Sequence, residues 1–183
     1  MIVSRLLFLL LLASICPNPA AAARLSREEA IEILSRTDTF ADTYVGFIGV
    51  ASREACAFRA VLDQPDADRL FKGILAKGHV AGRLYALCGL YFTDHPRFVQ
   101  EIQPYRERAD SVGMFSGCIS NRQRVAKLVE SSYPRVIRLK DPSETTDEWV
   151  ARNMGPDGSR DYSLDILGGG WPARFKEMKG CDR

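Results

Sequence analysis

The residues best suited to chemistry lie in one stretch, GHVAGRLYALCGLYFTDHP, which covers residues 78–96. It holds Cys88 and both histidines of the chain, His79 and His95. Nucleophilic catalysis often uses a thiol beside an imidazole. We expect a helix over about 79–92, and its rise of about 1.5 Å per residue places each histidine roughly 10 Å or more from the thiol along the axis. The spacing therefore argues against a catalytic pair, and the sequence predicts no catalytic residue.

Other signatures of catalysis or ligand binding are missing from the sequence. It has no Cys-x-x-Cys, His-x-x-x-His, Gly-x-Ser-x-Gly, phosphate-loop or dinucleotide-binding pattern. Asp157, Ser159 and Asp161 have the odd-position spacing of a calcium loop. Tyr162 and Gly168 stand where that loop requires glycine and glutamate. The sequence therefore predicts no metal site and no cofactor, and favours a protein that is not an enzyme.

The first 23 residues are typical of a secretory signal peptide. Arg5 precedes the apolar run LLFLLLLASI, and PNPAAAA then offers small residues for cleavage after position 22 or 23. The apolar run is too short to span a bilayer, and no later segment is apolar enough to do so. Cys16 follows Ile15, where a lipoprotein signal needs Gly or Ala, which argues against lipid anchoring. We expect export, to the periplasm or the medium.

Loss of this leader removes Cys16 from the five cysteines of the chain. Cys56, Cys88, Cys118 and Cys181 remain, and an even number in an exported chain predicts two disulfides. Of the three pairings, we favour Cys88–Cys118, which links a helix to a glycine-flanked connector, together with Cys56–Cys181. A buried free thiol is the alternative for Cys88.

Hydrophobic periodicity predicts a mainly α protein, a compact bundle of five to six short helices. Ser26 with Glu29 forms a capping box, and Ser52 is the N-cap of the next helix. The expected helices cover about 26–36, 52–63, 64–78, 79–92, 95–103 and 121–131, the last opened by a capping box of Ser120 and Gln123. Between them, residues 37–52 are expected to be a loop anchored by Phe40, Tyr44 and Phe47, and residues 111–120 a short extended connector.

The helix over 79–92 is apolar nearly all round, which is typical of a central helix. Gly82, Ala86 and Gly89 form a stripe of small residues, on which another backbone can lie close. We expect this helix at the centre of the bundle.

The segments AFRAVLD and AGRLYALCGL resemble the Ala/Leu spacing of HEAT-like helical repeats, over roughly residues 52–107. This resemblance implies stacked helical hairpins and a scaffold or binding role. We divide the chain into the leader (1–23), a helical domain (24–134) and an irregular C-terminal extension (135–183) packed on the same domain. The expected anchors of that extension are Trp149, Ile166, Leu167 and Trp171.

The net charge of the chain limits the classes of molecule that it is expected to bind. Removing residues 1–23 takes one of the 25 basic residues, Arg5, and none of the 23 acidic ones, so a net charge of +1 remains. This does not favour nucleic acid, which requires a clustered basic stripe. Arg122, Arg124 and Lys127 are interpreted as a solvated face, with a partner surface as the alternative.

The sequence thus predicts an exported, disulfide-stabilised helical protein, an interaction or accessory factor of the cell envelope whose partner is another protein. Its oligomeric state is left open. One alternative is a periplasmic hydrolase whose carboxylates converge only in three dimensions. Another is a protein that binds a small apolar ligand in a cavity lined by Phe58, Phe71 and Tyr85.

Overall fold

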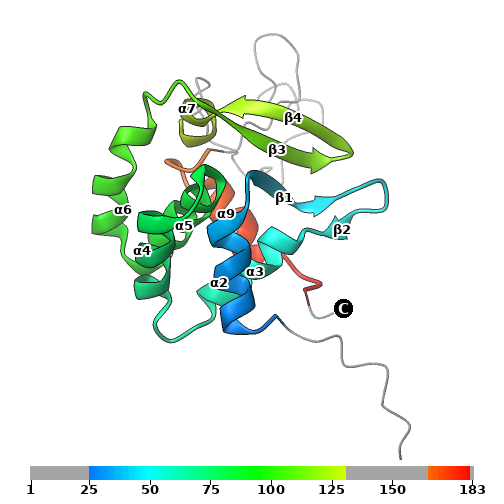
Figure 1. Cartoon of the computed structure of the whole chain (residues 1–183), viewed down its shortest axis with the longest axis horizontal. Coiled ribbons are helices and arrows are strands. Elements are labelled where there is room, and N and C mark those ends of the chain that lie inside the picture. The colour runs from blue at the N-terminus through cyan, green and yellow to red at the C-terminus, as the bar shows by residue number, and fades with distance from the viewer. Residues whose placement is uncertain (1–24, 131–164, 182–183) are drawn as a thin grey trace, which may run out of the picture.

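The fold is α/β, not the mainly α bundle that the sequence predicts. The computed structural model describes residues 25–130 and 165–181, and its helices and strands are coloured along the chain in Figure 1. Its helices are α2 (Arg27–Arg36), α3 (Arg53–Leu62), α4 (Ala67–Lys77), α5 (Val80–Thr93), α6 (His95–Glu101), α7 (Val125–Val129) and α9 (Gly170–Glu177), with a 3-10 turn, η1, at Gln103–Tyr105. Its strands are β1 (Thr39–Val45), β2 (Val50–Ala51), β3 (Ser111–Gly117) and β4 (Ile119–Arg124).

The four strands form one mixed sheet in the order β2-β1-β3-β4. β1 and β3 are parallel, and each continues into an antiparallel partner through a hairpin, β1 into β2 and β3 into β4. Because β1 and β3 run in the same direction, their two hairpin turns lie at the same end of the sheet, beyond the carboxyl ends of these two strands (Figure 1).

The sheet replaces two predicted features. Residues 37–52, expected to be a loop, form β1 and β2, and of the three expected anchors only Phe40 is buried. The helix expected over 121–131 is also wrong in its first half, because β4 runs through Arg124 before α7 begins. Gln123, assigned to a capping box, instead pairs with Val112 in the β3–β4 ladder.

The helix N-termini agree better with the sequence. Ser26 and Glu29 make the predicted capping box of α2, with both reciprocal hydrogen bonds, and the Ser52 hydroxyl accepts the Ala55 N–H at the start of α3. These are local interactions between residues three positions apart, so sequence spacing alone reveals them.

Helix α5 is central, as predicted. Its residues from Ala81 to Leu90 are buried except Arg83. A Cβ atom added to Gly82 would lie 2.0 Å from the Leu34 carbonyl oxygen on α2, and one added to Gly89 would meet the Phe71 ring on α4. The small residues therefore permit the close approach of α2 and α4 to α5.

The C-terminal segment completes the core. Ile166, Trp171 and Phe175 are buried, and the α9 residue Phe175 stacks with Trp171 and meets Phe40 and Tyr85 edge-on or tilted. Leu167 is half-buried against the same cluster. The leader, Cys16, the boundary near residue 134 and the expected anchor Trp149 lie outside the described residues.

The cavity that the ligand-binding alternative would require is filled by the protein itself. The rings of Phe58, Phe71 and Tyr85 are fully buried, with centroids 5.4 Å apart for Phe58–Phe71 and 6.4 Å apart for Phe58–Tyr85. These side chains pack on one another, so this part of the core offers no room for an apolar ligand.

Candidate functional site

The residues first considered for catalysis do not come together. Cys88 is fully buried on α5, and burial raises the pKa of its thiol well above the usual range, so the reactive thiolate is disfavoured. His79 Nδ1 lies 2.8 Å from Asp38 Oδ1, and His95 Nδ1 lies 3.3 Å from the Tyr91 carbonyl oxygen. Each histidine is thus engaged elsewhere, and the thiol has no access to solvent.

The described carboxylates give no support to a general acid. Where the pKa of a carboxyl group departs from its ordinary value, it is lowered, and in each case the largest cause is a hydrogen bond from a neighbour; the residues are Glu29, Asp66, Asp94, Asp110 and Glu130. A general acid working near neutral pH requires a raised pKa. No group of three or more metal-ligating side chains gathers among residues 25–130 and 165–181.

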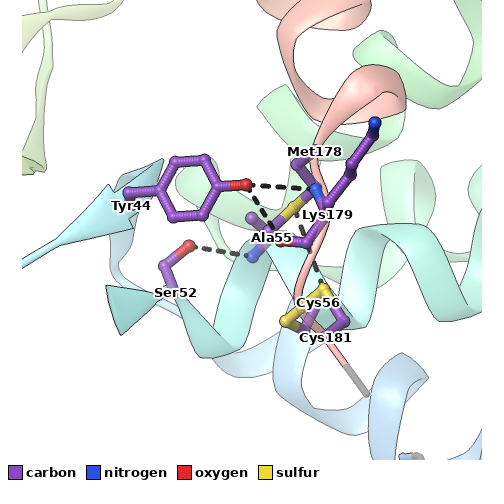
Figure 2. Close-up of a disulfide and its surroundings, with 7 residues drawn as sticks. All are labelled: Tyr44, Ser52, Ala55, Cys56, Met178, Lys179 and Cys181. Atoms are coloured by element: carbon purple, nitrogen blue, oxygen red, sulfur yellow. Dashed lines mark hydrogen bonds between the residues drawn. A yellow bond between two sulfur atoms is a disulfide. The ribbon is translucent and has the colours of Figure 1, made fainter. Parts of the chain in front are cut away.

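The four cysteines within the described residues divide into one bridged pair and two free thiols. The structure contains a disulfide between Cys56 on α3 and Cys181, with Cα atoms 5.3 Å apart (Figure 2). It does not pair Cys88 with Cys118, since Cys88 is buried and Cys118 is exposed in the turn between β3 and β4.

A surface depression of about 480 Å³ lies over this disulfide. Its lining comes from Leu25, from α3 and from the last described residues: Leu25, Cys56, Arg59, Ala60, Asp63, Gln64, Met178, Lys179, Gly180 and Cys181. Arg59 spans its wall, donating to Asp63 and to the Lys176 carbonyl oxygen. Arg59, Asp63 and Gln64 are each hydrogen-bonded within this part of the structure, which leaves few polar groups for a ligand to recognise.

The most unusual surface lies at the two hairpin turns. Five apolar side chains are exposed there, which we call the hairpin-tip patch: Tyr44 (40%), Phe47 (96%), Ile48 (84%), Val50 (55%) and Ile119 (66%). Single exposed apolar residues are ordinary on protein surfaces, but several of them near the same end of one sheet favour a site of interaction. In the rest of the described chain, the one other large apolar side chain with comparable exposure is Val99 on α6 (45%).

The turn between β1 and β2 presents two of these side chains at its apex. Gly46, Phe47, Ile48 and Gly49 form a turn in which the Gly49 N–H donates to the Gly46 carbonyl oxygen over 3.2 Å. Both glycines have positive φ angles, 77° and 66°, which other residues rarely adopt. Turn positions usually hold polar residues or glycine and proline. An aromatic and a branched aliphatic side chain at the apex project away from the body of their own chain.

Hydrogen bonds fix the position of this turn. The Gly46 N–H donates to the Gly117 carbonyl oxygen over 2.7 Å, which joins the two hairpin turns. The Ser52 N–H donates to the Thr43 carbonyl oxygen over 2.9 Å. At the base of the hairpin, the Tyr44 hydroxyl accepts the Lys179 N–H and donates to the carbonyl oxygen of the same residue (Figure 2). The patch is therefore held in place by residues far apart in the sequence.

A buried carboxylate anchors the same hairpin. The Asp42 side chain, 6% exposed, accepts hydrogen bonds from Arg174 Nε (2.6 Å) and Nη2 (2.9 Å) on α9. It also accepts from the Ser116 hydroxyl on β3 (2.9 Å) and the Thr43 N–H (2.6 Å). This network satisfies the buried charge and ties β1 to β3 and α9. We interpret it as a structural support, because every oxygen that could act chemically is already bonded.

Comparison with known proteins gives no further guide: no family model, curated protein or solved structure matches the chain. Helices long and apolar enough to cross a membrane are not found in the part of the chain that the structure describes. The sequence contains one signal for the patch, the apolar pair between glycines in GFIG, which falls in the segment where the sequence predicts an anchored loop.

Proposed function

We propose that the protein is an exported accessory factor of the cell envelope that acts by binding, and that the hairpin-tip patch is its binding surface. The single observation that carries this proposal is the exposure of Phe47 and Ile48 at the apex of a turn that is hydrogen-bonded both within itself and to its neighbour. A preorganised surface loses little conformational entropy on binding, which increases affinity.

Export rests on the leader-like sequence of residues 1–23 and on the disulfide between Cys56 and Cys181, a bond that persists in oxidising compartments. The envelope offers two classes of target to an apolar patch: a protein, which is the partner expected from sequence, and the bilayer itself. The hydrolase alternative is not favoured by any observation among the described carboxylates.

Fractionation of cells that produce a tagged form of the whole chain tests the proposal. We expect the wild-type protein in the envelope fraction and a Phe47→Ser/Ile48→Ser variant in the soluble exported fraction. The matched control is Val99→Ser, which removes an exposed apolar side chain from α6 and should leave the distribution unchanged.

Circular dichroism should show that both variants fold, since all three side chains are exposed. N-terminal sequencing of the exported protein should begin at Ala23 or Arg24. Identical distributions of the wild-type protein and the double variant would refute the proposed binding surface.

A further inference from the structure

The size of the hairpin-tip patch distinguishes between its two classes of target. Specific protein–protein interfaces involve about 20–30 residues on each side. The patch has five apolar members: Phe47 and Ile48 lie in the β1–β2 turn, and Tyr44, Val50 and Ile119 lie on the strand ends next to the two turns. A second copy of the chain that met it only at these turns would involve far fewer residues than that on each side. A lipid bilayer sets no such requirement, because any protruding apolar group can enter its interface.

The charges around the patch fit an anionic surface. Residues 43–53 and 111–127, which contain the whole patch, include no acidic residue. They include four basic residues: Arg53, Arg122, Arg124 and Lys127, all exposed. None of the four forms an ion pair with another residue of 25–130 or 165–181. The chain as a whole is nearly neutral, so this concentration of positive charge is a property of the region.

The spacing between the apolar and basic groups also fits the surface of an anionic bilayer. On β4, Arg122 follows Ile119 by three residues, which is about 10 Å along an extended strand. Apolar side chains of interfacial proteins enter the boundary between headgroups and acyl chains to a depth of about 5–10 Å. With Phe47, Ile48 and Ile119 at that depth, the Arg122 backbone would lie near the headgroups. Its guanidinium donates to the Ser111 carbonyl oxygen and so lies behind that level, within the range over which charge attracts an anionic surface.

We propose that the hairpin-tip patch inserts into the interface of a bilayer containing anionic phospholipids, with Arg122 and Arg124, which lie behind the tip on β4, attracting the anionic headgroups. This inference rests on the proposed function and names the target of the same surface. Insertion is reversible and shallow. It orients the molecule with the two hairpin turns toward the membrane and the helices away from it.

Vesicle binding tests this inference. Protein produced from its whole sequence is mixed with vesicles of phosphatidylethanolamine and phosphatidylglycerol, or with vesicles of phosphatidylcholine alone, and the bound fraction is measured by flotation. Cys118 lies in the β3–β4 turn and is exposed, whereas Cys88 is buried, so an environment-sensitive fluorophore can be attached at the tip.

We expect binding to the anionic vesicles and a blue shift of the tip fluorophore on binding. Phe47→Ser/Ile48→Ser should lower the partition coefficient at least about tenfold, since apolar transfer drives insertion. Arg122→Gln/Arg124→Gln should remove the preference for anionic over neutral vesicles and lower the dependence on salt, at about fivefold in affinity per arginine. Val99→Ser should bind as the wild-type protein does.

Absence of vesicle binding, or binding that the Phe47→Ser/Ile48→Ser substitution leaves unchanged, would overturn the inference. If envelope association of the wild-type protein then still depends on the tip and is abolished by protease treatment of the membranes, the target is a protein and the proposed function stands. If envelope association is independent of the tip as well, the proposed function fails together with the inference.

Discussion

Removal of one hydroxyl from the core tests how the sheet is held to the helices. Tyr85 on α5 is fully buried, and its hydroxyl accepts the Ala41 N–H (2.9 Å) and donates to the Ala41 carbonyl oxygen (2.7 Å). The N–H and C=O of one strand residue point to the same side of the strand. On that side, β2 pairs with β1 only at Tyr44 and Val45. The phenol therefore takes the place of a neighbouring strand at Ala41.

Tyr85→Phe keeps the ring and its packing against Phe40, whose centroid is 4.7 Å away, and removes only the hydroxyl. The change leaves one donor and one acceptor of Ala41 unpaired in the core. Each such group costs about 1–3 kcal/mol, so we expect the free energy of unfolding to fall by about 2–6 kcal/mol. Urea denaturation followed by circular dichroism measures this as a lower midpoint with an unchanged slope.

Tyr44→Phe is the matched control. The Tyr44 hydroxyl also accepts an N–H and donates to a carbonyl oxygen of a single residue, Lys179, but this side chain is 40% exposed. Water can replace both bonds there, so we expect a loss below about 1 kcal/mol. Equal losses for the two variants would refute the argument that burial, rather than the number of hydrogen bonds, determines the cost.

Three further predictions concern the cysteines and one carboxylate. Replacement of both Cys56 and Cys181 by serine should lower the free energy of unfolding by about 3–5 kcal/mol, because the bridge joins residues 125 positions apart; a loss below about 1 kcal/mol in denaturant curves would contradict this. In the native protein without reductant, a maleimide should label Cys118 and spare Cys88 until denaturant is added; peptide mapping that finds neither thiol reactive even in denaturant would instead indicate a bond between them. Hydrogen bonds from a lysine side chain and a backbone N–H hold the pKa of Asp94 below its ordinary value of about 3.9. Its stabilising effect is therefore complete above that value and is lost as the pH falls through the lower folded-state pKa. The stability difference between the wild-type protein and Asp94→Asn should narrow on acidification, and a difference independent of pH would count against this.

The parts of the fold that the sequence predicted are those determined locally. The capping box of Ser26 and Glu29 and the cap at Ser52 depend on residues three apart, and the stripe of Gly82 and Gly89 lies on one helix. Each was visible as a spacing in the sequence. The helices that these features begin or pack together occur where the spacing placed them.

The sheet could not be predicted in the same way, because it lacks the alternation that identifies a strand. In β1, four consecutive residues from Phe40 to Thr43 are buried, and in β4 nearly every residue is exposed. The parallel pairing of Phe40 with Met114 joins residues far apart in the sequence. At Ser120 and Gln123, a local helix signal competed with this distant partner, and the strand pairing prevailed.

The candidate site was missed for a related reason. The sequence placed Phe47 in an anchored loop because large apolar residues are usually buried, whereas the β1–β2 turn directs it outward. What keeps this turn in position comes from the other end of the chain. Arg174 binds Asp42 on β1, and the segment closed by the Cys181 disulfide presents Lys179 to Tyr44, two residues further along the same strand. An exposed apolar turn without a function would need no such support. The convergence of a buried ion pair and a disulfide-closed segment on one hairpin therefore supports the interpretation of its apex as the working surface of the protein.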